Sequence, residues 1–159
     1  MRPFSVVVLL IVCSPTAIAN AQEDAERQQR LEGDWLVVSY ESKTTHVVGP
    51  GAWKYRIRIH GDEFTLFEDD KAKPSAKAAI EKSTPMRIDL TWPDGTLGFG
   101  IFALHGDKMV IQTVQGKKGD VDQSDRPSKF GPTPDDDKEF MNTYVRIPTK
   151  GRQSKEGVK

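Results

Sequence analysis

The sequence contains a single cysteine, Cys13, and therefore no pair of thiols that could form an internal disulfide. Cys13 lies in an apolar N-terminal run that we expect to be absent from the mature protein. A mature chain without cysteine has no thiol nucleophile, and its stability must come from its own core. One alternative stays open. An apolar run that ends in cysteine can also mark a lipid-modified protein, although the bulky Val12 just before Cys13 departs from that pattern.

Histidine is also scarce, with only His46, His60 and His105 in the whole chain. These residues are too far apart in the sequence to form the close pairs that zinc sites usually use. No serine stands in the sequence context of a nucleophile elbow, so a serine triad is not indicated either. We therefore predict that the protein is not an enzyme, holds no metal and needs no cofactor.

Long apolar runs are missing as well. The longest, Phe4–Val12, is too short to anchor the chain stably across a bilayer. The positive Arg2 precedes this run, and Ala19–Ala21 supplies a small-x-small cleavage pattern after it. Residues 1–21 are thus predicted to be a secretory signal peptide that is cleaved near Ala21, with a buried N-terminal strand as the alternative. The mature protein is expected to be exported, either periplasmic or secreted, and to have no membrane span.

The chain has no excess of charge of either sign, with 23 basic and 23 acidic residues. Because the two signs are interspersed, nothing favours binding to nucleic acid or to an anionic membrane. The remaining residues amount to one domain, which is long enough to bury a core without disulfides. Residues 22–30 are expected to form a short helix or linker before this domain, and residues 149–159 a disordered basic tail.

What the sequence does contain is alternation of apolar and polar residues with a period of two. In the clearest case, Trp53–His60, four apolar residues point to one side and four polar residues to the other. The whole set of such segments is Trp35–Tyr40, Trp53–His60, a strand around Phe64 and Leu66, Ala76–Lys82, Met86–Thr91, Leu97–Leu104, Met109–Thr113 and Phe140–Ile147. We predict an all-β fold in which an antiparallel meander of about eight strands closes into a barrel; an open two-sheet sandwich is the alternative. The Ala-rich and Lys-rich segment from position 76 is the weakest of the eight.

The connections support this reading. The triplet His-Gly-Asp occurs at residues 60–62 and again at 105–107, each time between two apolar runs, which predicts two hairpins with similar tight turns. Gly98 and Gly100 lie inside a predicted strand, where glycine often marks a bend or a close approach. Such features are expected where a barrel wall curves.

Residues 115–139 break the pattern, because they form a long stretch rich in glycine, proline, aspartate and lysine. Loops of this length in a compact domain are usually either functional or disordered. We expect this loop to serve as a partial lid. Within it, Arg126, Pro127 and Phe130 combine a cation, a rigid residue and an aromatic ring, which predicts either an anchor for the loop or a ligand contact.

Several stretches together resemble a known family: LEGDWLVVS at 31–39, IDLT at 88–91, GIFALHGD at 100–107 and RPSKF at 126–130. Across residues 31–148 the chain resembles the uncharacterised lipocalin-like domain family of exported planctomycete proteins. The resemblance implies a lipocalin-like antiparallel barrel and no particular activity. It also implies that Gly33 and Trp35 form the barrel floor, with an arginine packed across the tryptophan. Arg146 is the first candidate for that arginine and Arg126 the second.

Two functional hypotheses follow. In the first, the protein is a binding module that holds a small hydrophobic or amphipathic ligand inside the barrel. The candidate ligand-binding residues are Trp53, Tyr55, Phe99, Phe102, Met109, Phe130 and Tyr144. In the second, the barrel is filled with side chains, and the protein is a structural or interaction domain with an envelope protein as partner. The sequence leaves open whether the barrel is hollow, and a hollow, apolar barrel would favour the first hypothesis.

Overall fold

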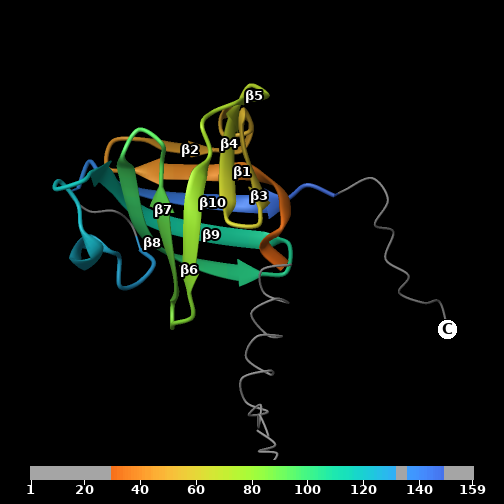
Figure 1. Ribbon diagram of the computed structural model, residues 1–159. Helices are drawn as coiled ribbons and strands as arrows, with labels where there is room; N and C mark the ends of the chain where they lie inside the picture. Colours follow the sequence, from red (N-terminus) through yellow and green to blue (C-terminus); the bar gives the residue numbers. More distant parts are fainter. Residues whose placement is uncertain (1–29, 132–135, 149–159) are drawn as a thin grey trace, which may run out of the picture. The chain divides into compact units, whose positions relative to one another are not determined.

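The computed structural model describes residues 30–131 and 136–148. The predicted signal peptide, nearly all of the predicted helix over 22–30 and the predicted tail from residue 149 lie outside the described residues. The domain considered below begins at Glu32 and is built of β-strands (Figure 1). Within the described part of the chain, no helix has the length and apolar character needed to cross a membrane.

Ten strands and two short 3-10 helices make up the described domain, in the following order. They are β1 (Gly33–Ser42), β2 (His46–Val48), η1 (Gly49–Gly51), β3 (Tyr55–His60), β4 (Glu63–Glu68), β5 (Lys71–Ala72), β6 (Ala76–Glu81), β7 (Met86–Thr91), β8 (Thr96–His105), β9 (Lys108–Lys117), η2 (Gln123–Asp125) and β10 (Glu139–Arg146).

Eight of these strands form a closed antiparallel barrel. The hydrogen-bonded order is β1-β3-β4-β6-β7-β8-β9-β10, and β10 pairs back onto β1. The two short strands β2 and β5 pair with β1 and β4 respectively and are not part of the ring. The predicted all-β barrel is confirmed, and its eight strands correspond to the eight segments of alternating sequence. Closure leaves none of these strands with an unpaired edge along its whole length, which a sandwich could not achieve.

The weakest seam of the ring lies between β4 and β6. Only two residue pairs join these strands, Glu63 with Lys77 and Phe64 with Ala76. A hydrogen bond of 2.7 Å between the hydroxyls of Thr65 and Ser75 adds to the seam. The strand that the sequence marks least clearly is therefore also the one that the barrel holds least firmly on one side.

One end of the barrel is closed by a packed floor. Trp35 is fully buried, and the guanidinium carbon of Arg146 lies 4.1 Å from the centre of its ring. The same guanidinium donates a hydrogen bond to the backbone oxygen of Glu32. Gly33 has a φ of +121°, and a Cβ at that position would lie 3.1 Å from Nη1 of Arg146. Glycine is thus needed here both for its backbone conformation and for the room it leaves.

The two glycines inside β8 mark close approaches, as expected from the sequence. A Cβ on Gly100 would lie 2.5 Å from Cγ2 of Thr113 on the neighbouring strand β9. A Cβ on Gly98 would lie 3.1 Å from the ring of Trp92. Both distances are shorter than ordinary contacts of a side chain, so the barrel wall closes up at these positions only because no side chain is present.

The loop after β9 packs against the outer face of the wall. Arg126, of which only 9% of the side chain is exposed, forms an ion pair with Asp89 on β7. Its guanidinium carbon also lies 5.9 Å from the centre of the Phe99 ring on β8. Ile101, on the same face of β8 as Phe99, is almost completely buried. Of the two candidate floor arginines, Arg126 therefore holds the loop to the outside of the barrel, and Arg146 lies across Trp35.

Two further contacts fix the path of this loop. The backbone N–H of Gly131 donates to the side-chain oxygen of Gln112, which is itself buried. Val121 is buried as well, and it packs so close to β9 that a Cβ on Gly116 would lie 2.8 Å from it. No described residue from 116 to 131 lines the cavity inside the barrel. Residues 116–131 thus do not form the expected partial lid, because Val121 and Arg126 pack against the outer wall instead. Of the described residues of the expected loop 115–139, only Gln115, near the end of β9, lines the cavity.

Candidate functional site: the cavity of the barrel

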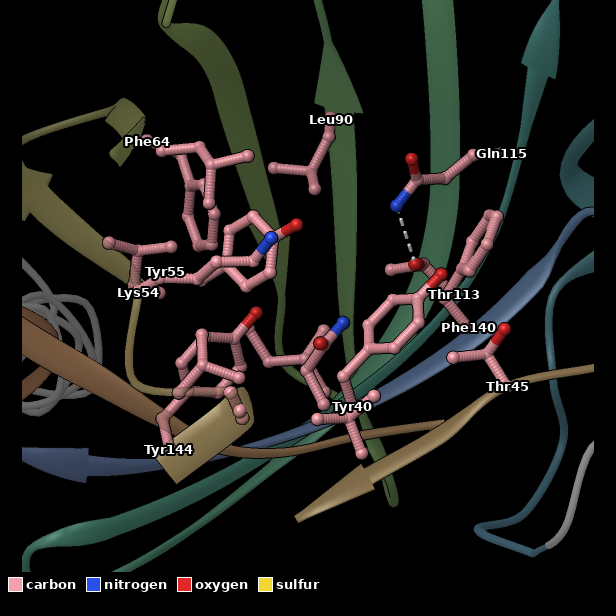
Figure 2. Close-up of a pocket in the computed structure, with 18 of the residues that line it drawn as sticks. Tyr40, Thr45, Lys54, Tyr55, Phe64, Leu90, Thr113, Gln115, Phe140 and Tyr144 are labelled. Carbon is pink, nitrogen blue, oxygen red and sulfur yellow. Dashed lines mark hydrogen bonds between the residues drawn. The ribbon is translucent and has the colours of Figure 1, made fainter. Parts of the chain in front are cut away.

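The barrel encloses a cavity of about 550 Å³ above the floor (Figure 2). Its wall is mainly apolar and comes from β1, β3, β4, β7, β9 and β10, together with residues of the segment 45–54. Aliphatic side chains from five of these strands face it: Val37, Ile57, Leu66, Leu90 and Ile111. Protein interiors rarely contain voids larger than a water molecule. The cavity is larger than such voids, and it is open to solvent at one end.

Strand β10 shows how the cavity is arranged along the barrel. Phe140, Asn142 and Tyr144 line the cavity, and Arg146, the next residue on that face, lies at the floor. Phe140 is at the opposite end, where its ring stacks on that of Tyr40 from β1 with centres 6.1 Å apart. Successive alternate residues of one strand thus run from the open end of the cavity to its base.

Tyr144 is the most deeply placed polar residue of the wall. Only 5% of its surface is exposed, and it pairs with Val37 on one side and Met109 on the other. Figure 2 shows its ring reaching from β10 into the cavity. Burial raises the pKa of the Tyr144 hydroxyl, so it stays protonated at any physiological pH. The hydroxyl has no hydrogen-bond partner among the described residues, and its oxygen stays accessible from the cavity.

Other polar groups lie closer to the open end. The amide of Asn142, half-buried on β10, also has no hydrogen-bond partner in the described part of the chain. The side chain of Gln115 donates a hydrogen bond of 3.0 Å to the hydroxyl of Thr113, so these two groups satisfy each other. The wall therefore carries unpaired neutral polar groups on β10 and a paired set on β9.

Charge is confined to the rim. Among the lining residues, only Lys54 is charged, and 45% of its side chain is exposed. Its ammonium nitrogen lies 4.8 Å from the centre of the Tyr55 ring and 3.8 Å from a carboxylate oxygen of Glu68. Hydrogen bonding to Tyr55 is the main cause that raises the pKa of Lys54. The cation is therefore already engaged at the entrance, and none of the described residues that line the deeper cavity is charged.

The structure places the predicted ligand-binding residues in three different environments. Tyr55 and Tyr144 line the cavity. Phe102 and Met109 are buried but do not reach it, and Phe99 and Phe130 lie outside its lining. Trp53 is 53% exposed.

Two of these placements have a clear physical reason. Strand β3 begins at Tyr55, because residues 52–54 still form a turn after η1, so the alternation does not extend back to Trp53. In β8 the inward positions belong to Gly98 and Gly100, which places Phe99 on the outer face. Phe99 and Phe102 are an odd number of residues apart, so a regular strand cannot direct both into the cavity.

Several lining residues were not predicted, although some of them could have been. Phe140 and Asn142 share the face of Tyr144, so extending the alternation along β10 identifies them. Tyr40 gives no such signal. The pairing of β1 with β10 shifts between Val37 and Ser39, and this bulge brings Tyr40 to the cavity where strict alternation would place Ser39.

None of the three histidines lines the cavity. His60, for example, is exposed at the floor end, where its ring lies 3.2 Å from a carboxylate oxygen of Glu32. Among the described residues, no three metal-ligating side chains come together as a metal site. The cavity thus offers surfaces for contact and hydrogen bonding, and no described acid and histidine converge in it. No family model matches the chain, and neither does any curated protein or any solved structure.

Proposed function

We propose that the protein is an exported binding module that takes a small apolar or amphipathic ligand into the barrel, and that it catalyses no reaction. The observation that carries this proposal is the cavity of about 550 Å³ with its mainly apolar wall. Cavities of roughly 300–1,000 Å³ with few polar groups are typical of small-molecule sites. Export rests on the signal-peptide pattern at residues 1–21, and membership of the lipocalin-like family stays a prediction that agrees with the barrel.

The direct test is native mass spectrometry of the mature protein purified from the envelope fraction of its own host. We expect an added mass that organic extraction removes, and uptake of an apolar fluorescent dye by the extracted protein. A clean mass without any dye uptake would contradict ligand binding. It would direct attention to a protein partner and to the large apolar side chains that are exposed on the surface, Val48, Trp53 and Ile80.

A pair of variants shows whether the dye enters the barrel. Asn142→Trp adds a bulky ring to the cavity wall and should abolish dye uptake. Thr143→Trp adds the same ring at the next position of β10, which is not among the cavity-lining residues, and should leave uptake unchanged. Equal effects of the two substitutions would mean that the dye binds elsewhere.

A further inference from the structure

The polar groups of the cavity bear on the kind of ligand it takes, and this step rests on the proposed function. The ring of Tyr144 is buried in the wall, whereas its hydroxyl extends into the cavity, where it stays accessible and has no partner among the described residues (Figure 2). When a ligand fills the cavity and displaces water from this hydroxyl, the hydroxyl loses its hydrogen bonds unless the ligand replaces them. A ligand atom that accepts a hydrogen bond from this hydroxyl avoids that loss, so the wall favours ligands that place such an atom near the base of the cavity.

The charge distribution limits what this atom can be. Among the described residues, Lys54 is the one cation that lines the cavity; it lies at the rim, 3.8 Å from Glu68. A carboxylate beside Tyr144 would therefore lose its water without gaining an opposite charge, which strongly disfavours the ionised form. The neighbouring unpaired amide of Asn142 is neutral too, and it can both donate and accept.

We propose that the natural ligand is uncharged, and that a carbonyl, ester or hydroxyl oxygen of the ligand accepts a hydrogen bond from Tyr144 deep in the cavity. The apolar part of the ligand lies against the aliphatic wall formed by residues such as Ile57 and Ile111. In this arrangement Tyr144 is the residue that selects for ligand chemistry. Lys54 contributes to the entrance and does not bind the polar group of the ligand.

The competing arrangement is an acid bound with its carboxylate outward at Lys54. Three probes that share one hydrocarbon chain distinguish this arrangement from the proposed one: dodecanoate, its methyl ester and dodecane. The binding of each is measured by displacement of the apolar dye, at a pH where the acid is ionised. The ester should bind at least about tenfold more tightly than dodecanoate. Tyr144→Phe should weaken the ester by about tenfold or somewhat less, as expected for one hydrogen bond, and leave dodecane unchanged.

Tyr144→Phe removes one oxygen that has no partner in the described protein, so the variant should fold normally, and its undiminished binding of dodecane confirms this. Lys54→Gln serves as the matched control and should leave ester binding unchanged. Dodecanoate that binds as tightly as the ester, or a Tyr144→Phe variant that binds the ester normally, would overturn the inference while leaving the binding module intact. If the dye itself is not taken up, the proposed function fails and this inference fails with it.

Discussion

At the floor of the barrel, Arg146 lies across the ring of Trp35 and donates to the backbone of Glu32. Two residues earlier on the same strand, the hydroxyl of Tyr144 faces an open cavity and has no partner among the described residues. The floor is filled and its polar group is bonded, whereas the wall above it leaves space and leaves polar groups free. A single strand therefore contributes to two regions that follow opposite rules of packing.

This difference in packing distinguishes the region that stabilises the fold from the region that can bind. A fully packed and hydrogen-bonded region is what a stable fold requires, and departures from it concentrate at sites that bind or react. We infer that the floor holds the barrel closed, and that the wall from Phe140 to Tyr144 is kept incomplete for a ligand. Substitutions in the two regions should then differ in kind, since floor variants should lose stability and wall variants should lose binding.

The largest effect is expected for Trp35→Ala, which removes the central ring of the floor. Trp35 is fully buried, and truncating a buried tryptophan lowers the free energy of unfolding by about 3–5 kcal/mol. Urea denaturation followed by circular dichroism measures this. Trp53→Ala is the matched control, because 53% of Trp53 is exposed, and it should change stability by about 0.5 kcal/mol or less. Equal losses in the two variants would remove the distinction between floor and surface.

A smaller loss is expected for Gly33→Ala. The φ of +121° is unfavourable for alanine, and the added Cβ would press on the guanidinium of Arg146 at 3.1 Å. Together these effects should lower stability by about 2–3 kcal/mol. Gly106→Ala is the control: its φ is +60° and a Cβ there would meet no atom within 4 Å, so only about 1 kcal/mol should be lost. If Gly106→Ala is as harmful as Gly33→Ala, the contact with Arg146 contributes nothing.

The floor residues Gly33 and Trp35 also show how much of the fold can be predicted from the sequence. Alternation predicts all eight strands of the ring, because a half-buried strand must keep its apolar side chains on one face. The Gly33-x-Trp35 pattern matches the observed floor for a similar reason, since few residues other than glycine tolerate that backbone conformation beside a packed arginine. The features that can be predicted from the sequence are thus those that local backbone geometry imposes.

The cavity is harder to predict because its position depends on register. The bulge after Val37 turns Tyr40 inward, and nothing in the local sequence marks it. The placement of Arg126 is equally non-local: its partner Asp89 lies 37 residues earlier in the chain, so neither the docking of the loop nor the absence of a lid in its described part can be read from composition. Whether a barrel is hollow depends on the sum of such placements and not on any one segment.

A wall substitution should behave differently from the floor variants. Asn142→Leu replaces an unpaired, half-buried amide by an apolar side chain of similar size. We expect its stability to be unchanged or raised by up to about 1 kcal/mol, because no hydrogen bond within the described protein is lost and apolar surface is gained. Urea denaturation is again the measurement. A loss of more than about 2 kcal/mol would show that this wall is held together as the floor is.

The smallest effect concerns the cavity end of the barrel, where the turn that carries Trp92 is fastened by exposed groups. Lys117 lies 2.8 Å from the carboxylate of Asp94, and this contact, with hydrogen bonds from Thr96, lowers the pKa of Asp94 from 3.8 to about 2. The folded state therefore binds this proton less readily than the unfolded state does. The resulting stabilisation is present above pH 3.8 and is lost as the pH falls towards 2.

Asp94→Asn should consequently lower stability only slightly at neutral pH, as is usual for an exposed ion pair. The difference in urea midpoint between wild type and variant should shrink as the pH falls through this window, and it should also shrink at high salt, because exposed charges are screened. A difference that does not change with pH would show that Asp94 acts through its shape in the turn and not through its charge. In that case packing would hold the cavity end as it holds the floor. The two ends of the barrel would then differ in the polar groups of β10 that lack a partner among the described residues.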